Sequence, residues 1–132
     1  MRFDAPLDAA DVRIVAASNR SLRQAIAEGR FREDLYFRLA VVTVQLPPLR
    51  ERVDDIVAIA EHCLQQIARE QGRPAPDVDP ALAAALRARP WPGNVRQLRN
   101  EMQRLWAMAQ GGPLRSEMLS PAEPDAAAVL AP

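Results

Sequence analysis

Four side chains in this sequence have the chemistry to contact a phosphate group: Asn19, Arg32, Arg38 and Arg96. Arginine suits that role because its planar guanidinium stays charged and can donate two parallel hydrogen bonds to phosphate oxygens. Arg32 and Arg38 are six residues apart, which is about 9 Å along a helix axis and roughly a third of a turn in angle. Two arginines placed in this way could reach different oxygens of one polyphosphate.

Arg32 and Arg38 also have a simpler interpretation as surface residues. Arg32 precedes two acidic residues, Glu33 and Asp34, and an ion pair with either would satisfy its charge. Arg38 is harder to explain in this way, because the apolar residues among positions 35–39 predict half-buried surroundings. For Arg32 taken alone, the ion pair is the better interpretation.

Asn19 and Arg96 each have two interpretations as well. Asn19 follows the apolar segment Val12–Ala17, and polar groups at the end of a buried strand often contact ligands; a turn is the simpler explanation, because Asn is a good turn former. Arg96 is expected in the first turn of a helix, where the free N–H groups attract an anion and a cation is mildly unfavourable. This small cost suggests that Arg96 serves an external anion, unless Glu101 or a neighbouring carboxylate compensates its charge.

The composition excludes several classes of site. The 132 residues include 17 basic side chains, all of them Arg, so a phosphate-binding loop of the Gly-Lys-Ser/Thr type has no lysine to use. The single Cys63 and the single His62 leave no disulfide or metal cluster, and we assign them to the core and to the surface, respectively. The net charge of zero provides no general attraction to nucleic acid or anionic membranes. No signal peptide or apolar membrane segment is recognisable, so a cytoplasmic location is expected.

The first part of the sequence predicts two short strands with helices between them. The segments Val12–Ala17 and Val41–Leu46 are apolar and β-branched, as is typical of buried strands. Between them, Ser21 and Gln24 predict a capping box, in which the hydroxyl accepts a free N–H and the Gln side chain reaches back. Because helices separate the strands, we expect a parallel pair that belongs to a larger α/β sheet.

From residue 50 onward the pattern is helical. Apolar residues recur at three- and four-residue steps from Val53 to Ile67, Asp79 caps a helix that starts at Pro80, and Asn94 caps a third. Trp91, between two prolines, is interpreted as a packing residue. Helices are expected over about 21–28, 32–39, 54–70, 80–89 and 94–110.

These patterns divide the sequence into four parts. Residues 1–10 are expected to be an irregular leader, residues 11–49 an α/β part, and residues 50–112 a part made of three helices. Residues 113–132 contain Pro, Ala and acidic residues without a period, which predicts a disordered tail.

Five motifs follow one another in a specific order. They are DVRIVAASN at 11–19, GRFREDLYFRL at 29–39, LPPLRER at 46–52, DDI at 54–56 and WPGNVRQL at 91–98. In this order and spacing they closely resemble the AAA+ ATPase domain of sigma-54-dependent bacterial transcription activators, the enhancer-binding proteins. The resemblance covers roughly residues 11–110.

This resemblance implies an α/β fold class: a partial P-loop NTPase (AAA+) core with its last two parallel strands, followed by an all-α lid subdomain of three helices. It implies that Asn19 is the first sensor of the γ-phosphate. It also implies that Arg32 and Arg38 are arginine fingers, which act in trans on the ATP of a neighbouring subunit. Arg96 would be the second sensor, carried by the lid over the ATP of its own subunit.

In this family, a hexameric ring of AAA+ subunits hydrolyses ATP with Mg²⁺ to remodel sigma-54 RNA polymerase at promoters. The sequence lacks the family's phosphate loop, its Mg²⁺-binding acid, the loop that contacts sigma-54 and the helix-turn-helix that binds enhancer DNA. We therefore expect a fragment of a longer parent, which alone neither binds ATP tightly nor hydrolyses it, holds no metal and has no membrane partner.

Two other functions compete with this interpretation. The chain could be a non-enzymatic interaction module that docks on intact AAA+ ring subunits. It could also be a small helical DNA-binding protein, although its neutral charge and lack of Lys argue against that.

Overall fold

The computed structural model describes residues 11–122. The chain separates into two compact units, with the division between Gln45 and Leu46, and each unit is described by itself. The predicted leader, residues 1–10, lies outside the described residues, as does the end of the predicted tail, residues 123–132.

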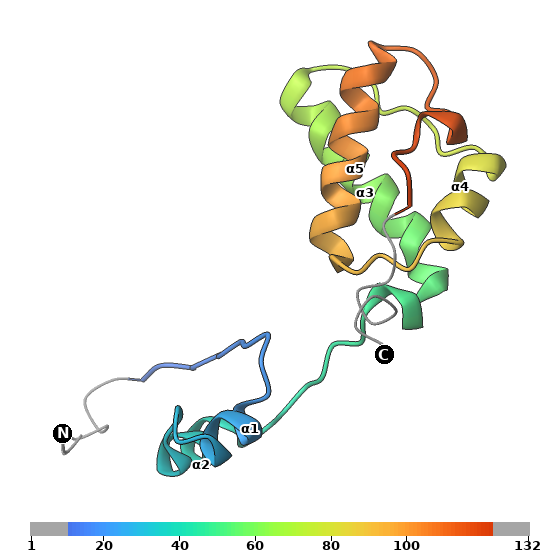
Figure 1. The fold of residues 1–132 in the computed structure, drawn as a ribbon. Coiled ribbons are helices and arrows are strands. Elements are labelled where there is room, and N and C mark those ends of the chain that lie inside the picture. The colour runs from blue at the N-terminus through green and yellow to red at the C-terminus, as the bar shows by residue number, and fades with distance from the viewer. Residues whose placement is uncertain (1–10, 123–132) are drawn as a thin grey trace, which may run out of the picture. The chain divides into compact units, whose positions relative to one another are not determined.

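The first unit contains two short helices, α1 (Leu22–Ala27) and α2 (Glu33–Leu39) (Figure 1). The Ser21 hydroxyl accepts the Gln24 N–H at 3.3 Å, as predicted for the start of α1. The second half of the capping box is wrong, because the Gln24 amide instead donates to Glu28 Oε1 at 3.2 Å. Gly29, at φ +72°, ends α1 in the left-handed region that favours glycine.

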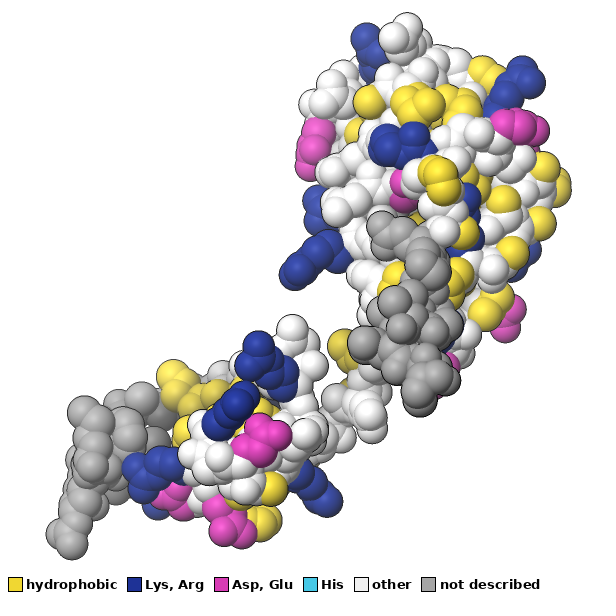
Figure 2. Space-filling view, viewed as in Figure 1, with side chains coloured by type: hydrophobic (Ala, Val, Ile, Leu, Met, Phe, Trp, Pro, Cys, Tyr) yellow, Lys and Arg dark blue, Asp and Glu magenta, His cyan; other side chains and the backbone are white. Residues whose placement is uncertain are grey.

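Neither predicted strand forms, and residues 11–122 contain no strand at all. Val12, Val15, Val42 and Val44 leave 69%, 84%, 82% and 76% of their surface exposed, and apolar side chains are visible on the surface of this unit (Figure 2). The physical reason is that a strand needs a neighbour for its backbone N–H and C=O groups. The predicted partial α/β core is therefore not confirmed, because the fold of residues 11–122 is helical.

The second unit contains the three predicted helices, α3 (Val53–Gln71), α4 (Pro80–Arg87) and α5 (Asn94–Ala109). α3 packs against both α4 and α5, and a 3₁₀ turn, η2 (Leu49–Glu51), precedes it (Figure 1). The buried cluster consists of Leu49, Ile56, Ala60, Cys63, Leu64, Ile67, Leu82, Leu86, Trp91, Leu98, Met102, Leu105 and Leu114. As predicted, Cys63 lies in this core and His62 is exposed.

Local capping fixes the start of α4. The Asp79 carboxylate accepts the Leu82 N–H at 2.7 Å, and Pro80 occupies the first turn, where a missing N–H costs nothing. No helix of residues 11–122 has both the length and the apolar character required to cross a membrane.

The turn between α4 and α5 is fixed by Trp91. Its side chain is 2% exposed, and the indole N–H donates to the Leu86 carbonyl at 2.8 Å. The packing interpretation of Trp91 is therefore confirmed. Asn94, at φ +51°, does not act as the predicted cap; its side-chain oxygen accepts the Leu49 N–H at 3.0 Å. The N–H of Gly93, the residue before α5, is satisfied by Gln97 Oε1 at 2.9 Å.

Residues 113–122 differ from the predicted disordered tail. Leu114 is 1% exposed within the core, and a 3₁₀ turn, η3 (Ser116–Met118), contacts α4. Ser120 then forms hydrogen bonds with Glu101 of α5. This segment has no sequence period because it packs as an irregular chain over the helices.

Candidate functional site

A polar pocket lies at the N-terminal end of α5. It has a volume of about 420 Å³, and its lining includes three arginines, Arg89, Arg96 and Arg104, with one carboxylate, Glu101. Trp91 forms part of the apolar wall. Such a lining favours an anion as the occupant of the pocket.

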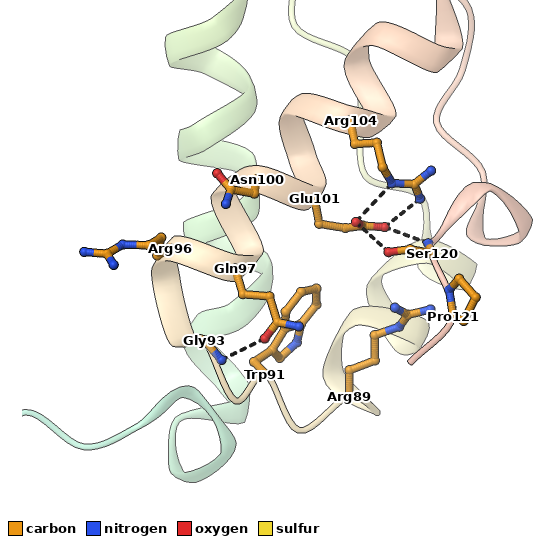
Figure 3. Close-up of a pocket in the computed structure, with 10 residues that line it drawn as sticks. All are labelled: Arg89, Trp91, Gly93, Arg96, Gln97, Asn100, Glu101, Arg104, Ser120 and Pro121. Atoms are coloured by element: carbon orange, nitrogen blue, oxygen red, sulfur yellow. Dashed lines mark hydrogen bonds and ion pairs between the residues drawn. The ribbon is translucent and has the colours of Figure 1, made fainter. Parts of the chain in front are cut away.

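Arg96 lies in the first turn of α5, as predicted, and its side chain is exposed. Nothing within residues 11–122 forms an ion pair or hydrogen bond with its guanidinium. Figure 3 shows the side chain extending away from the Glu101 carboxylate. The alternative that Glu101 compensates Arg96 is therefore wrong in this structure.

Glu101 is instead committed to Arg104 and Ser120 (Figure 3). Arg104 donates to its two oxygens at 2.7 and 3.1 Å, and the N–H and hydroxyl of Ser120 donate at 2.8 and 2.7 Å. Burial alone would raise the pKa of Glu101, but these hydrogen bonds and the charge of Arg104 outweigh it and lower the pKa from 4.5 to about 2. The same contact raises the pKa of Arg104.

Arg89 is a pocket residue that the sequence patterns did not identify. It precedes Pro90 at the end of α4, is half-buried, and has no ion-pair or hydrogen-bond partner in the described part of the chain. Its only sequence signal is its position two residues before Trp91.

Arg32 is not part of α2 but the residue that precedes it, with extended backbone angles. Its guanidinium forms a bidentate pair with Asp34, at 2.8 and 3.1 Å. Both side chains are more than 60% exposed, at 63% and 62%. The pair is the simple surface interpretation, and exposed pairs of this kind contribute little to stability.

Arg38 lies in the last turn of α2, where a cation complements the helix dipole. Its side chain is exposed, and no residue between 11 and 122 pairs with it. The expected half-buried surroundings are wrong in this structure, because Leu35, Phe37 and Leu39 are 44%, 66% and 36% exposed.

Asn19 lies in an exposed bend. The preceding Ser18 hydroxyl accepts the Arg20 N–H at 3.2 Å, which makes a local turn around Asn19. This geometry matches the turn interpretation. Asn19, Arg32 and Arg38 belong to the first unit and Arg96 to the second, so the structure brings together only the pocket residues around Arg96.

Two families match consecutive parts of the chain. Residues 50–128, more than half of the sequence, match the AAA+ ATPase lid domain. Residues 5–45 match the Sigma-54 interaction domain.

Curated relatives are transcription regulators. The chain is 46% identical over 110 residues to the hydrogenase transcriptional regulatory protein HoxA of Cupriavidus necator, covering 83% of this chain and 23% of the relative. It is 54% identical over 101 residues to the DNA-binding transcriptional regulator NtrC of Escherichia coli, covering 76% and 22%. The chain thus spans about a quarter of the length of these relatives.

The fold also resembles a solved structure, that of NtrX from Brucella abortus in complex with ATP. The TM-score is 0.73 at 38% identity, over 92% of this chain and 31% of that one. Together with the two family matches, this confirms the resemblance that the motifs predicted. The chain belongs to the sigma-54-dependent bacterial transcription activators and corresponds to the C-terminal part of their AAA+ ATPase domain.

Proposed function

We propose that this chain supplies the phosphate-sensing arginines and the lid of an AAA+ activator ATPase. In the complete protein, the substrate is ATP, with Mg²⁺, and its hydrolysis by a hexameric ring in the cytoplasm remodels sigma-54 RNA polymerase bound at a promoter. The observation that carries the proposal is Arg96: an unpaired guanidinium in the first turn of α5, on the rim of an arginine-lined pocket, within a segment that matches the AAA+ lid.

The residues present fit the phosphates of ATP in two respects. The first turn of α5 adds helix-end polarity to the positive charge of Arg96. Arg89 lines the same pocket and has no carboxylate partner among residues 11–122, while the Arg96 guanidinium extends outward at the rim (Figure 3). ATP supplies the phosphoanhydride bond. This chain supplies positive charge that holds the phosphates and a lid that closes over them.

Arg32 and Arg38 are proposed as the arginine fingers of the neighbouring subunit's site, and Asn19 as the first sensor. The free guanidinium of Arg38 supports its role directly. Arg32 would have to exchange its Asp34 partner for a phosphate, and this exchange is inexpensive because the ion pair is exposed.

By itself, the chain is proposed not to hydrolyse ATP. It contains no lysine, so a Gly-Lys-Ser/Thr loop for the β- and γ-phosphates cannot come from these 132 residues. Measurable turnover by the purified chain with Mg²⁺ would contradict this proposal.

The sensor roles can be tested in a chimera, in which this sequence replaces the matching region of full-length Escherichia coli NtrC. Arg96→Ala should weaken both nucleotide binding and hydrolysis, because the lid closes over its own subunit's phosphates. Arg99→Ala is the matched control, since it removes an exposed arginine from the same helix. Equal effects of the two variants would contradict the role of Arg96.

The fingers can be tested in the same chimera. Arg38→Ala should reduce the hydrolysis rate by about a thousandfold or more while leaving nucleotide binding nearly unchanged. Arg30→Ala is the control, because it removes another exposed arginine close to α2. Mixing Arg38→Ala subunits with subunits that cannot bind nucleotide should restore some activity at their shared interfaces, and failure to do so would place Arg38 in cis.

A second candidate function is a non-enzymatic module that docks on intact AAA+ subunits. The large exposure of Val12, Ile14 and Val15, at 69%, 68% and 84%, favours it, because apolar segments of this kind invite a partner. Co-elution of the chain with a full-length relative in size-exclusion chromatography would support this function, and separate elution would reject it.

A further inference from the structure

The segment Leu114–Pro121, called the strap below, is held at its two ends by different forces. It leaves α5 after a turn at Gln110 and Gly111, both with positive φ, of 48° and 87°. Leu114 then anchors it to the core by burial, at 1% exposed. Between Leu114 and the far end, Arg115 and Glu117 are exposed and the other side chains are half-buried. Burial is therefore most complete at Leu114, while Met118 and Leu119 are only partly buried against the same core.

The far end is held by hydrogen bonds to the carboxylate of Glu101, which we call the latch, and by Met118 and Leu119, which pack partly buried against the core. Glu101 accepts both the N–H and the hydroxyl of Ser120, at 2.8 and 2.7 Å. Arg104, which is paired with the same carboxylate, also donates to the Met118 carbonyl. The Glu101 side chain is only 9% exposed, so its loss would leave Arg104 and the Ser120 donors without their acceptor in a partly dry site.

The end of the strap is also a wall of the arginine pocket. Ser120 and Pro121 line it opposite residues from the α4–α5 turn, including Trp91 and Gly93 (Figure 3). If Ser120 leaves Glu101, the pocket loses this wall and becomes more open to solvent.

We propose that Leu114–Pro121 is a movable strap, anchored by Leu114 and latched by Glu101, whose release opens the pocket beside Arg96. Hydrophobic burial keeps the anchor in place while the latch opens, so the motion is local and does not require unfolding of the three helices.

The full 132-residue chain tests this by amide hydrogen exchange with single-residue resolution. Glu101→Gln should accelerate exchange of the Ser120 amide by roughly tenfold or more, because a charge-assisted acceptor is replaced by a neutral one. The Leu105 amide, within α5, should keep its rate. The matched control is Glu117→Gln, which neutralises an exposed carboxylate of the strap and should leave Ser120 unchanged.

Ser120→Ala provides a second test that keeps the Glu101–Arg104 pair intact. It should raise trypsin cleavage after Arg115 and accelerate exchange within the strap, by less than Glu101→Gln does. If Glu101→Gln fails to fold, this variant decides alone. Unchanged strap exchange, or equal acceleration in α5 and the strap, would overturn the proposal.

The wall is tested by the fluorescence of Trp91 in a Trp106→Phe background, where it is the only tryptophan. Adding Glu101→Gln should shift the Trp91 emission to the red, and adding Glu117→Gln should not. Faster Ser120 exchange without this shift would show that the strap opens but does not form a wall of the pocket.

Discussion

Trp91→Phe should destabilise the three-helix unit by about 2–3 kcal/mol. The change removes the indole N–H, which donates to the Leu86 carbonyl at 2.8 Å in a buried site. Loss of that hydrogen bond costs about 1 kcal/mol, and the carbonyl at the end of α4 is left without it. The smaller phenyl ring also leaves a void where the side chain is 2% exposed, which adds roughly 1–2 kcal/mol.

Urea denaturation followed by circular dichroism at 222 nm measures this loss without relying on tryptophan fluorescence. With a slope of about 1 kcal/mol per molar urea for a small unit, the midpoint should fall by about 2–3 M. Trp106→Phe is the matched control, because that ring is only half-buried and its N–H has no partner within residues 11–122. It should cost less than about 1 kcal/mol. If Trp91→Phe lowers the free energy of unfolding no more than Trp106→Phe does, the indole hydrogen bond does not stabilise the α4–α5 turn, and the reasoning is refuted.

Three further outcomes follow from the same structure. Asp79→Ala should lower the free energy of unfolding by about 1 kcal/mol, through loss of the cap on the Leu82 N–H, whereas Asp77→Ala, two residues earlier, should change it little; equal losses would contradict the cap. Glu101 has its pKa lowered from 4.5 to about 2 in the folded chain, so its contribution to stability is complete above pH 4.5 and is lost as the pH falls toward 2. Acid titration of Glu101→Gln should therefore show a flatter decline over this range than the parent chain, and parallel curves would contradict the low pKa. In hydrogen exchange, amides of α3 from Val57 to Ile67 should be better protected than those of Val12–Ala17, and equal protection would contradict the difference in burial between these two segments.

The helices of the second unit could be predicted from sequence because their signals are local. α3 begins and ends within one residue of the range that its apolar period predicts. Asp79 and Pro80 mark the start of α4 through contacts three residues away or fewer. Trp91 could be assigned to packing because a large apolar ring between two prolines has few other roles.

The errors came from interactions that no local pattern contains. The segments Val12–Ala17 and Val41–Leu46 have the composition of buried strands, but a strand forms only beside another strand. Glu101 and Ser120 are 19 residues apart, so the packing of the strap leaves no period in the sequence.

Only the part of the candidate site that depends on local signals could be predicted from the sequence. The position of Arg96 in the first turn of α5 follows from the helix start. The absence of an ion pair between Arg96 and Glu101 does not follow from the sequence, because it depends on the hydrogen bonds that Arg104 and Ser120 donate to the Glu101 carboxylate. Arg89 could not be predicted as a site residue, because it belongs to no motif and reaches the pocket only through the turn at Trp91.

The hydrogen bond from the Leu49 N–H to Asn94 joins residues 45 positions apart, at 3.0 Å. It matters for anyone who wants to produce the three-helix unit alone. A gene trimmed at the predicted boundary, to begin at Arg50, would discard a side chain that is 1% exposed and leave Asn94 without its donor. Starting at Leu46, where the second unit begins, retains both and preserves the turn that leads into the helix of Arg96.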